Sequence, residues 1–348
     1  MLATVIHAAR DIRVEEVPDP QLSTGGDAIV RVVAACVCGS DLWPYRGITP
    51  TNEPHRIGHE FVGVVEEIGP DVNHVKVGDF VIAPFYVCDF TCVNCRNGFS
   101  TSCLQGSWWG GDDRQGHPAD GGQGELIRVP LADGTLAVVP GPVDEALVPH
   151  LLTLSDVMGT GHHAAVSAGV QKGDTVVVVG DGAVGLCGVL AASRLGASRI
   201  VAMSRHASRQ ELARQFGATD IVEERGDDGV ARIKELTGGL GAHSTIEAVG
   251  TQESMMQAIR ATRAGGHVGY VGVSHDVALP GEELFFSGVH LHGGPAPVRR
   301  FLPELIRLIW DRTIDPGKVF DLTLPLEKAA EGYQAMDERR ATKVLLTL

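Results

Sequence analysis

A cysteine, a histidine and an aspartate, far apart in the chain, could together bind a catalytic metal ion. Cys38 follows an apolar segment typical of a strand, His59 precedes another, and Asp156 ends the stretch Thr153-Leu154-Ser155-Asp156. One thiolate, one imidazole and one carboxylate suit Zn²⁺ and leave its fourth position open for water or substrate, as catalytic rather than structural sites do. Glu60 is a rival ligand, and we expect it either to contact the ligands from outside the coordination shell or to exchange with one of them.

Each of these residues also has an ordinary structural explanation. A single cysteine after a strand is usually a small core residue, and Asp156 could be the N-cap of a helix. Spacing alone does not choose between the explanations, because the three residues lie far apart in the sequence.

A second group of possible metal ligands is a cluster of four cysteines within 16 positions: Cys88, Cys92, Cys95 and Cys103. Such a cluster, with a Cys-x-x-Cys pair inside it, predicts a closed structural Zn²⁺ site, because four thiolates leave no position for a substrate. The alternative is a lobe without metal whose thiols are free or oxidised. Cys36 and Cys187 fall in apolar strand and helix patterns, where we expect core residues.

A glycine-rich turn predicts a dinucleotide site. Residues 176–179 are four consecutive valines, typical of a strand buried on both faces, and a helix pattern runs from the turn to Gly196. Strand, glycine turn and helix in this order place a pyrophosphate against the helix N-terminus. The G-x-G-x-x-G motif itself supplies the expected cofactor contacts Gly180, Gly182, Ala183, Val184 and Gly185.

The end of the next strand, 199–203, bears on the choice of coenzyme. An acidic residue there would bind the ribose 2′-OH of NAD. The chain instead reads Ser204-Arg205-His206, with Arg209 nearby, so no carboxylate would repel a 2′-phosphate and Arg205 could bind one with two hydrogen bonds. The sequence therefore favours NADP(H) over NAD(H), while a solvated loop cation is the ordinary explanation of Arg205.

Length and charge set limits on the class of protein. A chain of 348 residues is too long for one typical core and predicts two domains. Its formal net charge of −14 argues against binding to nucleic acid or to an anionic membrane surface. We find no secretory signal pattern and no apolar run of about 18 residues, so we expect a cytoplasmic protein with small-molecule partners.

Strand and helix patterns divide the chain into two parts. Residues 1 to about 150 are β-rich, with strands predicted at 3–7, 12–17, 27–35, 61–68 and 79–84. From about 155 to 290 strands and helices alternate, which predicts a doubly wound parallel sheet. After the glycine turn the elements are helix 207–216, strand 220–222, helix 228–237, strand 244–249, helix 252–264 and strand 266–273. Helices 298–310 and 326–336 follow, and a strand at 343–348 is expected to return to the β-rich part, because a terminal strand needs a partner sheet.

In order and spacing, these motifs resemble the zinc-dependent branch of the medium-chain dehydrogenase/reductases, the alcohol dehydrogenase family. The resemblance covers essentially the whole chain. It rests on the cysteine lobe, the Asp156 stretch, the glycine turn and three further motifs: Cys38-Gly39-Ser40-Asp41, Gly58-His59-Glu60-Phe61-Val62-Gly63 and Val75-Lys76-Val77-Gly78-Asp79-Phe80-Val81. It implies an α/β protein with a GroES-like β-rich catalytic domain, residues 1–154 and 295–348, and a Rossmann coenzyme domain, residues 155–294.

The resemblance also implies roles for individual residues. Cys38, His59 and Asp156 would ligate the catalytic zinc, and Asp156 stands where many members have cysteine. Asp41 would accept the other ring N–H of His59, which fixes the tautomer of the ligand. Ser40 would hydrogen-bond the substrate oxygen and pass on its proton.

The family also implies a role for Thr160, and the chain departs from the family pattern in two places. Thr160 would border the nicotinamide. The usual relay histidine is missing after residue 41, so the proton would leave Ser40 through the coenzyme ribose or water, with His55 as a possible substitute. In the lobe the family has Cys-x₂-Cys-x₂-Cys-x₇-Cys, whereas Cys88 is displaced by one position.

The reaction implied is hydride transfer between an alcohol, aldehyde or ketone and a nicotinamide coenzyme, with catalytic Zn²⁺ and a second, structural Zn²⁺. The alternatives are a polyol or sugar dehydrogenase, a zinc-free NADPH-dependent quinone or enone reductase of the same superfamily, and a non-catalytic redox sensor. Homo-oligomers, dimers or tetramers, are usual in the family. The sequence does not identify the substrate, the stereochemistry or the favoured direction.

Overall fold

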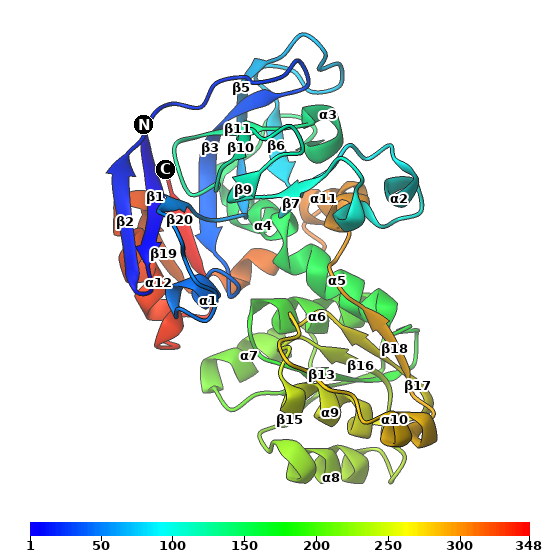
Figure 1. Ribbon diagram of the computed structural model, residues 1–348. Coiled ribbons are helices and arrows are strands. Elements are labelled where there is room, and N and C mark those ends of the chain that lie inside the picture. Colours follow the sequence, from blue (N-terminus) through cyan, green and yellow to red (C-terminus); the bar gives the residue numbers. More distant parts are fainter. The chain divides into compact units, whose positions relative to one another are not determined.

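The computed structural model describes all 348 residues, which form two compact units (Figure 1). The β-rich unit comprises Met1–Asp156 and Pro297–Leu348, and the parallel-sheet unit comprises Val157–Ala296. The parallel-sheet unit is therefore inserted into the chain of the β-rich unit. None of the helices combines the length and the apolarity that crossing a bilayer requires.

The main sheet of the β-rich unit has seven strands in the order β12-β6-β5-β3-β20-β19, and β11 also pairs with β3. The long central strand β3 is almost wholly apolar and buried, which suits a strand that pairs with β5, β11 and β20. The strands are β3 (Ala28–Val37), β5 (Phe61–Ile68), β6 (Phe80–Ala83), β11 (Leu126–Val129), β12 (Ala137–Val138), β19 (Leu322–Pro325) and β20 (Val344–Thr347).

The return of the last strand to this sheet is confirmed. Strand β20 pairs antiparallel with β3, with Val344 opposite Val37 and Leu346 opposite Ala35. Segments from the two ends of the chain thus share one sheet, as the colours of Figure 1 show.

Three small sheets and short helices complete the β-rich unit. One sheet joins β1 (Leu2–Ala8), β2 (Asp11–Glu16) and β4 (His55–Arg56), and two ribbons pair β7 (Tyr86–Val87) with β8 (Ser107–Trp108) and β9 (Gly111–Asp112) with β10 (Pro118–Ala119). The helices are α1 (Leu42–Tyr45), α2 (Val93–Arg96), α3 (Ala132–Thr135), α4 (Val148–Leu152), α11 (Leu302–Trp310) and α12 (Ala329–Asp337).

The parallel-sheet unit has six parallel strands in the order β15-β14-β13-β16-β17-β18. Numbered along the chain this is the order 3-2-1-4-5-6 of the doubly wound dinucleotide-binding fold, and it confirms the predicted fold class. The strands are β13 (Thr175–Val179), β14 (Arg199–Met203), β15 (Asp220–Val222), β16 (Ala242–Glu247), β17 (Thr262–Tyr270) and β18 (His290–Gly293). The helices are α5 (Val157–Ser167), α6 (Ala183–Arg194), α7 (Ala207–Gln215), α8 (Gly226–Leu236), α9 (Gln252–Ala261) and α10 (Gly281–Ser287).

Several element limits differ from the sequence predictions by a few residues, and two helices show the physical reason. Helix α9 ends at Ala261 rather than 264, because Thr262 already has extended dihedrals and its hydroxyl donates to the Ala258 carbonyl. Helix α11 begins at Leu302 rather than 298, after a separate 3₁₀ turn at Val298–Arg300. The short elements α10 and β18 were not predicted, since neither has a clear hydrophobic period.

Candidate catalytic metal site

The pairing of β3 with β5 brings the first two predicted metal ligands together. Cys38 directly follows β3, and His59 lies two residues before β5. These strands are antiparallel, with Ala35 opposite Phe61, so the end of one lies beside the start of the other. The third residue, Asp156, ends the 3₁₀ turn Thr153–Ser155, which a hydrogen bond from Phe85 N to Ser155 O ties to the end of β6.

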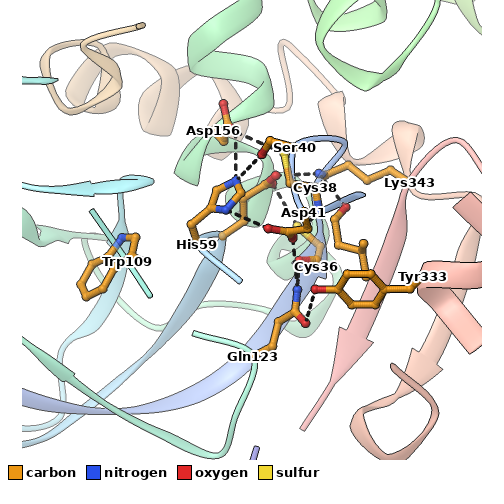
Figure 2. A network of polar contacts seen from close by, with 12 residues as sticks. Cys36, Cys38, Ser40, Asp41, His59, Trp109, Gln123, Asp156, Tyr333 and Lys343 are labelled. Carbon is orange, nitrogen blue, oxygen red and sulfur yellow. Dashed lines mark hydrogen bonds and ion pairs between the residues drawn. The ribbon is translucent and has the colours of Figure 1, made fainter. Parts of the chain in front are cut away.

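The geometry of this group fits a tetrahedral zinc ion. Asp156 Oδ2 lies 3.6 Å from Cys38 Sγ and 3.7 Å from His59 Nε2. Ligand atoms at ordinary zinc distances would be about 3.6 Å apart for sulfur and oxygen and about 3.4 Å apart for nitrogen and oxygen. One ligand atom from each of Cys38, His59, Glu60 and Asp156 lies within 4.8 Å of the others. Figure 2 shows Cys38, His59 and Asp156 converging.

The charges of the group also call for a cation. The carboxyl groups of Asp41, Glu60 and Asp156 are buried, and Lys343 supplies one positive charge against them. Burial and the charge of Glu60 raise the pKa of the Cys38 thiol to about 11. Uncompensated buried charge is costly, and a dication held by Cys38 and Asp156 would provide the compensation.

His59 is oriented by Asp41. Its Nδ1 lies 3.1 Å from Asp41 Oδ1, which leaves Nε2 to face Asp156. Burial opposes a charged imidazole, but the Asp41 carboxylate and the Cys38 thiolate outweigh it and raise the pKa of His59 well above its usual value. Asp41 Oδ2 in turn accepts a hydrogen bond from Cys38 N at 2.9 Å, so one carboxylate connects two of the predicted ligands.

A chain of polar groups beyond Asp41 was not predicted from the sequence. Gln123 Nε2 donates to Asp41 Oδ2 at 3.4 Å and to Cys36 O at 3.1 Å, and Tyr333 OH donates to Gln123 Oε1 at 3.0 Å. Tyr333 lies on α12, which follows the inserted parallel-sheet unit along the chain. No local motif marks such a contact, since it depends on how distant segments pack.

Glu60 has partners of its own behind the ligands. Its Oε1 lies 2.8 Å from Lys343 Nζ, and its Oε2 accepts from Cys36 Sγ at 3.0 Å. Lys343 also donates to Val37 O at 3.3 Å. The sequence analysis missed Lys343; the one available signal is a lysine at the start of an otherwise apolar strand pattern.

The other residues of the predicted active site lie as follows. Ser40 Oγ is 3.4 Å from His59 Nε2, the ring nitrogen that faces Asp156. Thr160 lies on α5 and is buried in the parallel-sheet unit. His55 lies on β4, is exposed, and its Nδ1 contacts Glu53 O at 2.9 Å.

Aromatic rings line the side of the site at β5 and the β7–β8 ribbon. Phe85 packs edge-on against the His59 ring, with 6.5 Å between the ring centroids. It also stacks on Trp108, with 5.9 Å between the centroids. Trp109, drawn in Figure 2, packs against Phe61 at 5.2 Å and donates its indole N–H to Pro84 O. The surroundings of His59 on this side are therefore apolar.

The glycine turn has the backbone geometry of a dinucleotide site. Gly180 has φ +117°, a conformation that glycine adopts readily. A Cβ at Gly185 would overlap the carbonyl oxygen of Gly180, whereas a Cβ at Gly182 would have no protein atom within 4 Å. Helix α6 (Ala183–Arg194), which contains Ala183 and Val184, begins directly after Gly182 without a side-chain cap, so its first N–H groups are available to an anion.

Polar groups gather at the end of β14, where the sequence predicts the contacts that set the coenzyme preference. Ser204 Oγ donates to Asp181 Oδ2 at 2.7 Å, and Arg209 Nη1 lies 3.2 Å from Asp181 Oδ1. Arg205 is exposed, and His206 is the N-cap of α7. Asp181, between the first two glycines of the turn, was not among the predicted contacts.

Arg225 is a further cation that the sequence analysis missed. Its Nη2 donates to Met203 O at 3.4 Å. Burial lowers the pKa of Arg225, Asp181 opposes this shift, and the positive charge of Arg205 adds to it. Arg205 and Arg225 are therefore close enough to repel one another, and no short motif connects two arginines from different loops.

The cysteine lobe differs from the predicted ligand set at one residue. The structure brings Asp89, Cys92, Cys95 and Cys103 together, each with a ligand atom within 4.8 Å of the others. Cys88 points elsewhere, because its Sγ donates to Gly134 O at 3.7 Å. Cys88 is therefore not one of the four residues whose ligand atoms the structure groups, and its place as a ligand stays a prediction.

A ligand set for a catalytic metal in one unit and a dinucleotide turn in the other define the class of zinc-binding dehydrogenases. Two family models match the chain, "Alcohol dehydrogenase GroES-like domain" over residues 24–142 and "Zinc-binding dehydrogenase" over residues 183–311. The chain belongs to the zinc-dependent alcohol dehydrogenase family, as its motifs predicted, and is an oxidoreductase with a GroES-like domain and a Rossmann domain. The family implies Zn²⁺ and a nicotinamide coenzyme.

Individual relatives cover the whole chain. A probable zinc-binding alcohol dehydrogenase of Mycobacterium tuberculosis is 37% identical over 351 residues, which span 100% of this chain and 88% of the relative. Zinc-type alcohol dehydrogenase B of Aspergillus flavus is 33% identical over 99% of this chain and 81% of the relative. Among solved structures, alcohol dehydrogenase TADH from Thermus sp. ATN1 has a TM-score of 0.90 and 32% identity, covering 100% of this chain and 99% of that one.

Proposed function

We propose that this chain catalyses reversible, zinc-dependent oxidation of alcohols to aldehydes or ketones with NADP(H) as the preferred coenzyme. The observation that carries the proposal is the group Cys38, His59 and Asp156, whose donor atoms have the separations of a tetrahedral zinc site. Three protein ligands leave one position for the substrate oxygen. A zinc-free quinone or enone reductase would have no use for this buried donor set.

The residues of the site divide the chemistry among them. When bound by Cys38, His59 and Asp156, Zn²⁺ supplies a Lewis acid that acidifies a hydroxyl or polarises a carbonyl. Ser40 Oγ, beside His59 Nε2, would hydrogen-bond the substrate oxygen and accept its proton during alcohol oxidation. The proton would then leave through the coenzyme ribose or water, while the hydride passes to C4 of the nicotinamide.

The aromatic side of the site bears on the class of alcohol. Phe85 packs against His59, Trp108 stacks on Phe85, and the two rings offer few groups that could pair with the hydroxyls of a sugar. Substrate hydroxyls left unpaired against such surfaces would lose their hydrogen bonds to water. This favours alcohols with an apolar substituent over polyols.

The charge at the end of β14 supports the coenzyme preference. Arg209 pairs with Asp181, and Arg225 interacts electrostatically with Asp181, Glu253 and Arg205, so three arginines meet two carboxylates and positive charge is in excess there. A 2′-phosphate would be attracted to this excess, whereas the 2′-hydroxyl of NAD would gain little from it. Ser204, His206 and Thr160 are included as further coenzyme contacts.

The same proposal includes the location and the oligomeric state of the protein: a cytoplasmic homo-oligomer, dimer or tetramer. Cell fractionation would test the location, and light scattering would test the number of subunits.

The decisive experiment compares His59→Ala with His55→Ala, the exposed histidine four positions earlier. Zinc per chain, alcohol-dependent reduction of NADP⁺ and NADPH binding would be measured on both variants and on the parent protein. We expect His59→Ala to lose turnover and one zinc ion while it binds NADPH normally, and His55→Ala to resemble the parent. Alcohol oxidation that persists in His59→Ala would refute the zinc mechanism. A parent protein without zinc would favour the quinone or enone reductase.

A further inference from the structure

We propose that Gln123 and Tyr333 are positioning residues for the predicted catalytic metal site. The Tyr333 hydroxyl orients the Gln123 amide, and the amide holds the Asp41 carboxylate in the direction that His59 requires. Both residues act through Asp41 rather than on the ligands themselves, as Figure 2 shows. The inference rests on the proposed function, because it gives the two residues a task in a zinc site.

The partners of the Gln123 amide fix which way it faces. A backbone carbonyl only accepts hydrogen bonds, so the amide nitrogen must face Cys36 O, which lies 3.1 Å from Nε2. The amide oxygen then faces the Tyr333 hydroxyl at 3.0 Å, which donates to it. One N–H of Nε2 is used on Cys36 O, and the other is left for Asp41 Oδ2 at 3.4 Å. Turning the amide over would place its oxygen against a carbonyl and a carboxylate.

The Asp41 carboxylate needs a fixed orientation because it serves two other groups. Its Oδ1 lies 3.1 Å from His59 Nδ1, and its Oδ2 accepts from Cys38 N at 2.9 Å. The contact with Nδ1 decides which ring nitrogen of His59 is free to be a ligand. Gln123 adds a second donor to Oδ2, and this contact is the longer of the two. We therefore expect its loss to loosen the carboxylate and histidine pair rather than to abolish it.

The main chain at Gln123 is bonded to the segment that carries His59. Gln123 N donates to Ile57 O at 3.2 Å, and Gly122 N donates to Gly58 O at 2.8 Å. A Cβ at Gly58 would lie 2.4 Å from Gln123 Cγ, so the glutamine side chain passes directly beside the residue before His59. The side chain is completely buried. The glycine before the predicted ligand therefore leaves the room through which the amide reaches the carboxylate.

Tyr333 is held by the packing of helix α12 beside α1. Its ring is fully buried and lies 5.6 Å from the ring of Tyr45, measured between centroids. At the end of α12, Asp337 pairs with Arg46 at 2.6 Å and with Arg10 at 3.2 Å, which ties the helix to α1 and to the turn after β1. Burial raises the pKa of Tyr333 well above its usual value, so the hydroxyl keeps its proton and can donate to the amide.

The rate at which the site gives up zinc to an excess of a coloured chelator tests this role without turnover. The parent protein would be compared with Gln123→Met, which fills the space without hydrogen bonds, and with Tyr333→Phe, which keeps the ring. The phase of release that is missing in His59→Ala belongs to the catalytic site. We expect release about tenfold faster in Gln123→Met and about threefold faster in Tyr333→Phe, because outer partners of a zinc histidine contribute about 10–100-fold to metal affinity.

A matched control separates this role from general packing. Tyr45→Phe removes the hydroxyl of the neighbouring ring, which is not part of this chain of hydrogen bonds, and should release zinc at the parent rate. Thermal unfolding would be measured on every variant. If release follows the unfolding midpoint across the whole series, Tyr45→Phe included, Gln123 and Tyr333 have only a structural role and the inference is overturned.

A double variant tests whether Tyr333 acts through Gln123. In Gln123→Met the amide is gone, so adding Tyr333→Phe should not speed release further. Effects of the two changes that multiply would overturn the assignment of Tyr333. Zinc that is present in the parent but leaves equally fast from Gln123→Met would refute this inference alone. A parent protein without any zinc that His59→Ala loses would refute the proposed function and the inference with it.

Discussion

Lys343 Nζ lies 2.8 Å from Glu60 Oε1, and both side chains are almost completely buried. The two residues are 283 positions apart. Lys343 also donates to the carbonyl of Val37, the residue before the predicted ligand Cys38. Lys343, the residue directly before strand β20, therefore contributes the positive charge that balances Glu60 behind the predicted metal site.

We expect Lys343→Met to destabilise the β-rich unit strongly. Removing one partner of a buried ion pair leaves an uncompensated charge and costs about 3–5 kcal/mol. Adding Glu60→Gln should restore part of this loss, because the remaining charge is then removed. Urea unfolding of the two single variants and the double variant measures the coupling. Lys318→Met, which breaks the exposed pair with Asp315, should cost less than about 1 kcal/mol. Additive effects of Lys343→Met and Glu60→Gln would show that the pair is not coupled.

Two glycines of the dinucleotide turn should respond differently to alanine. Gly182→Ala adds a methyl group where no protein atom lies within 4 Å, so the protein should fold normally but lose affinity for NADP(H) at least tenfold, because the methyl group would occupy the space of the pyrophosphate. Gly185→Ala would overlap Gly180 O and should also lower the thermal unfolding midpoint. Fluorescence titration with NADPH and thermal unfolding separate the two effects. Unchanged NADPH affinity in Gly182→Ala would place the coenzyme elsewhere.

The coenzyme preference should reverse when the charge at the end of β14 is reversed. Arg205→Asp places a carboxylate beside the expected 2′-phosphate, so KM for NADP⁺ should rise at least tenfold while KM for NAD⁺ falls. Arg214→Asp, an exposed arginine on α7, is the matched control and should leave both values close to the parent. If the ratio of the two KM values is the same in Arg205→Asp as in the parent, Arg205 does not contact the 2′-phosphate.

Acid should remove the contribution of a buried ion pair at β11. Arg128 Nη2 lies 2.7 Å from Asp113 Oδ2, and Nη1 lies 2.7 Å from Asp27 Oδ2. Burial works against the charge of Asp113, but Arg128 and backbone amides outweigh it and lower the pKa of Asp113. A carboxyl whose pKa is lowered on folding stabilises the protein above its unfolded pKa, and this stabilisation is lost as pH falls through the folded pKa.

Asp113→Asn should therefore lower stability by about 1–3 kcal/mol at pH 7. The difference from the parent should shrink as the pH falls below about 4, because the parent carboxyl then becomes protonated as well. Asp112→Asn, at the exposed neighbouring position, is expected to have little effect. Urea unfolding at several pH values measures both variants. A difference that stays constant down to pH 3 would mean that packing, not charge, explains it.

The sequence predicted best where the signal is local or periodic. The four valines of β13, with Gly180 and Gly185 after them, specify a buried strand and a turn through nearby residues. The doubly wound parallel sheet followed from alternating patterns, apart from its sixth strand β18. Cys38, His59 and Asp156 were selected as a set because a known family has ligands in that order. The structure adds their separations, which no spacing along the chain contains.

The missed residues act through long-range packing. Lys343, Gln123 and Tyr333 reach the site from segments that the sequence alone does not place beside β3 and β5. Cys88 illustrates a different limit, since counting cysteines favoured that thiol and passed over Asp89, whose carboxylate the structure groups with Cys92, Cys95 and Cys103. Which of two adjacent side chains faces the cluster depends on the backbone at Phe90 and on hydrogen bonds to Gly134 and Thr135, and composition does not report either.

The insertion of the parallel-sheet unit into the β-rich unit has a consequence for the order of events during synthesis. At roughly 5–20 residues per second, the ribosome needs roughly 15–60 s between making Glu60 and making Lys343, its partner 283 positions later. The cysteine lobe, residues 88–103, is complete much sooner, while most of the chain is still to be made. The main sheet must wait for β20, so Glu60 stays without its balancing charge until the inserted unit has left the ribosome. A chaperone that recognises exposed β-strands would have this interval in which to bind the unfinished sheet.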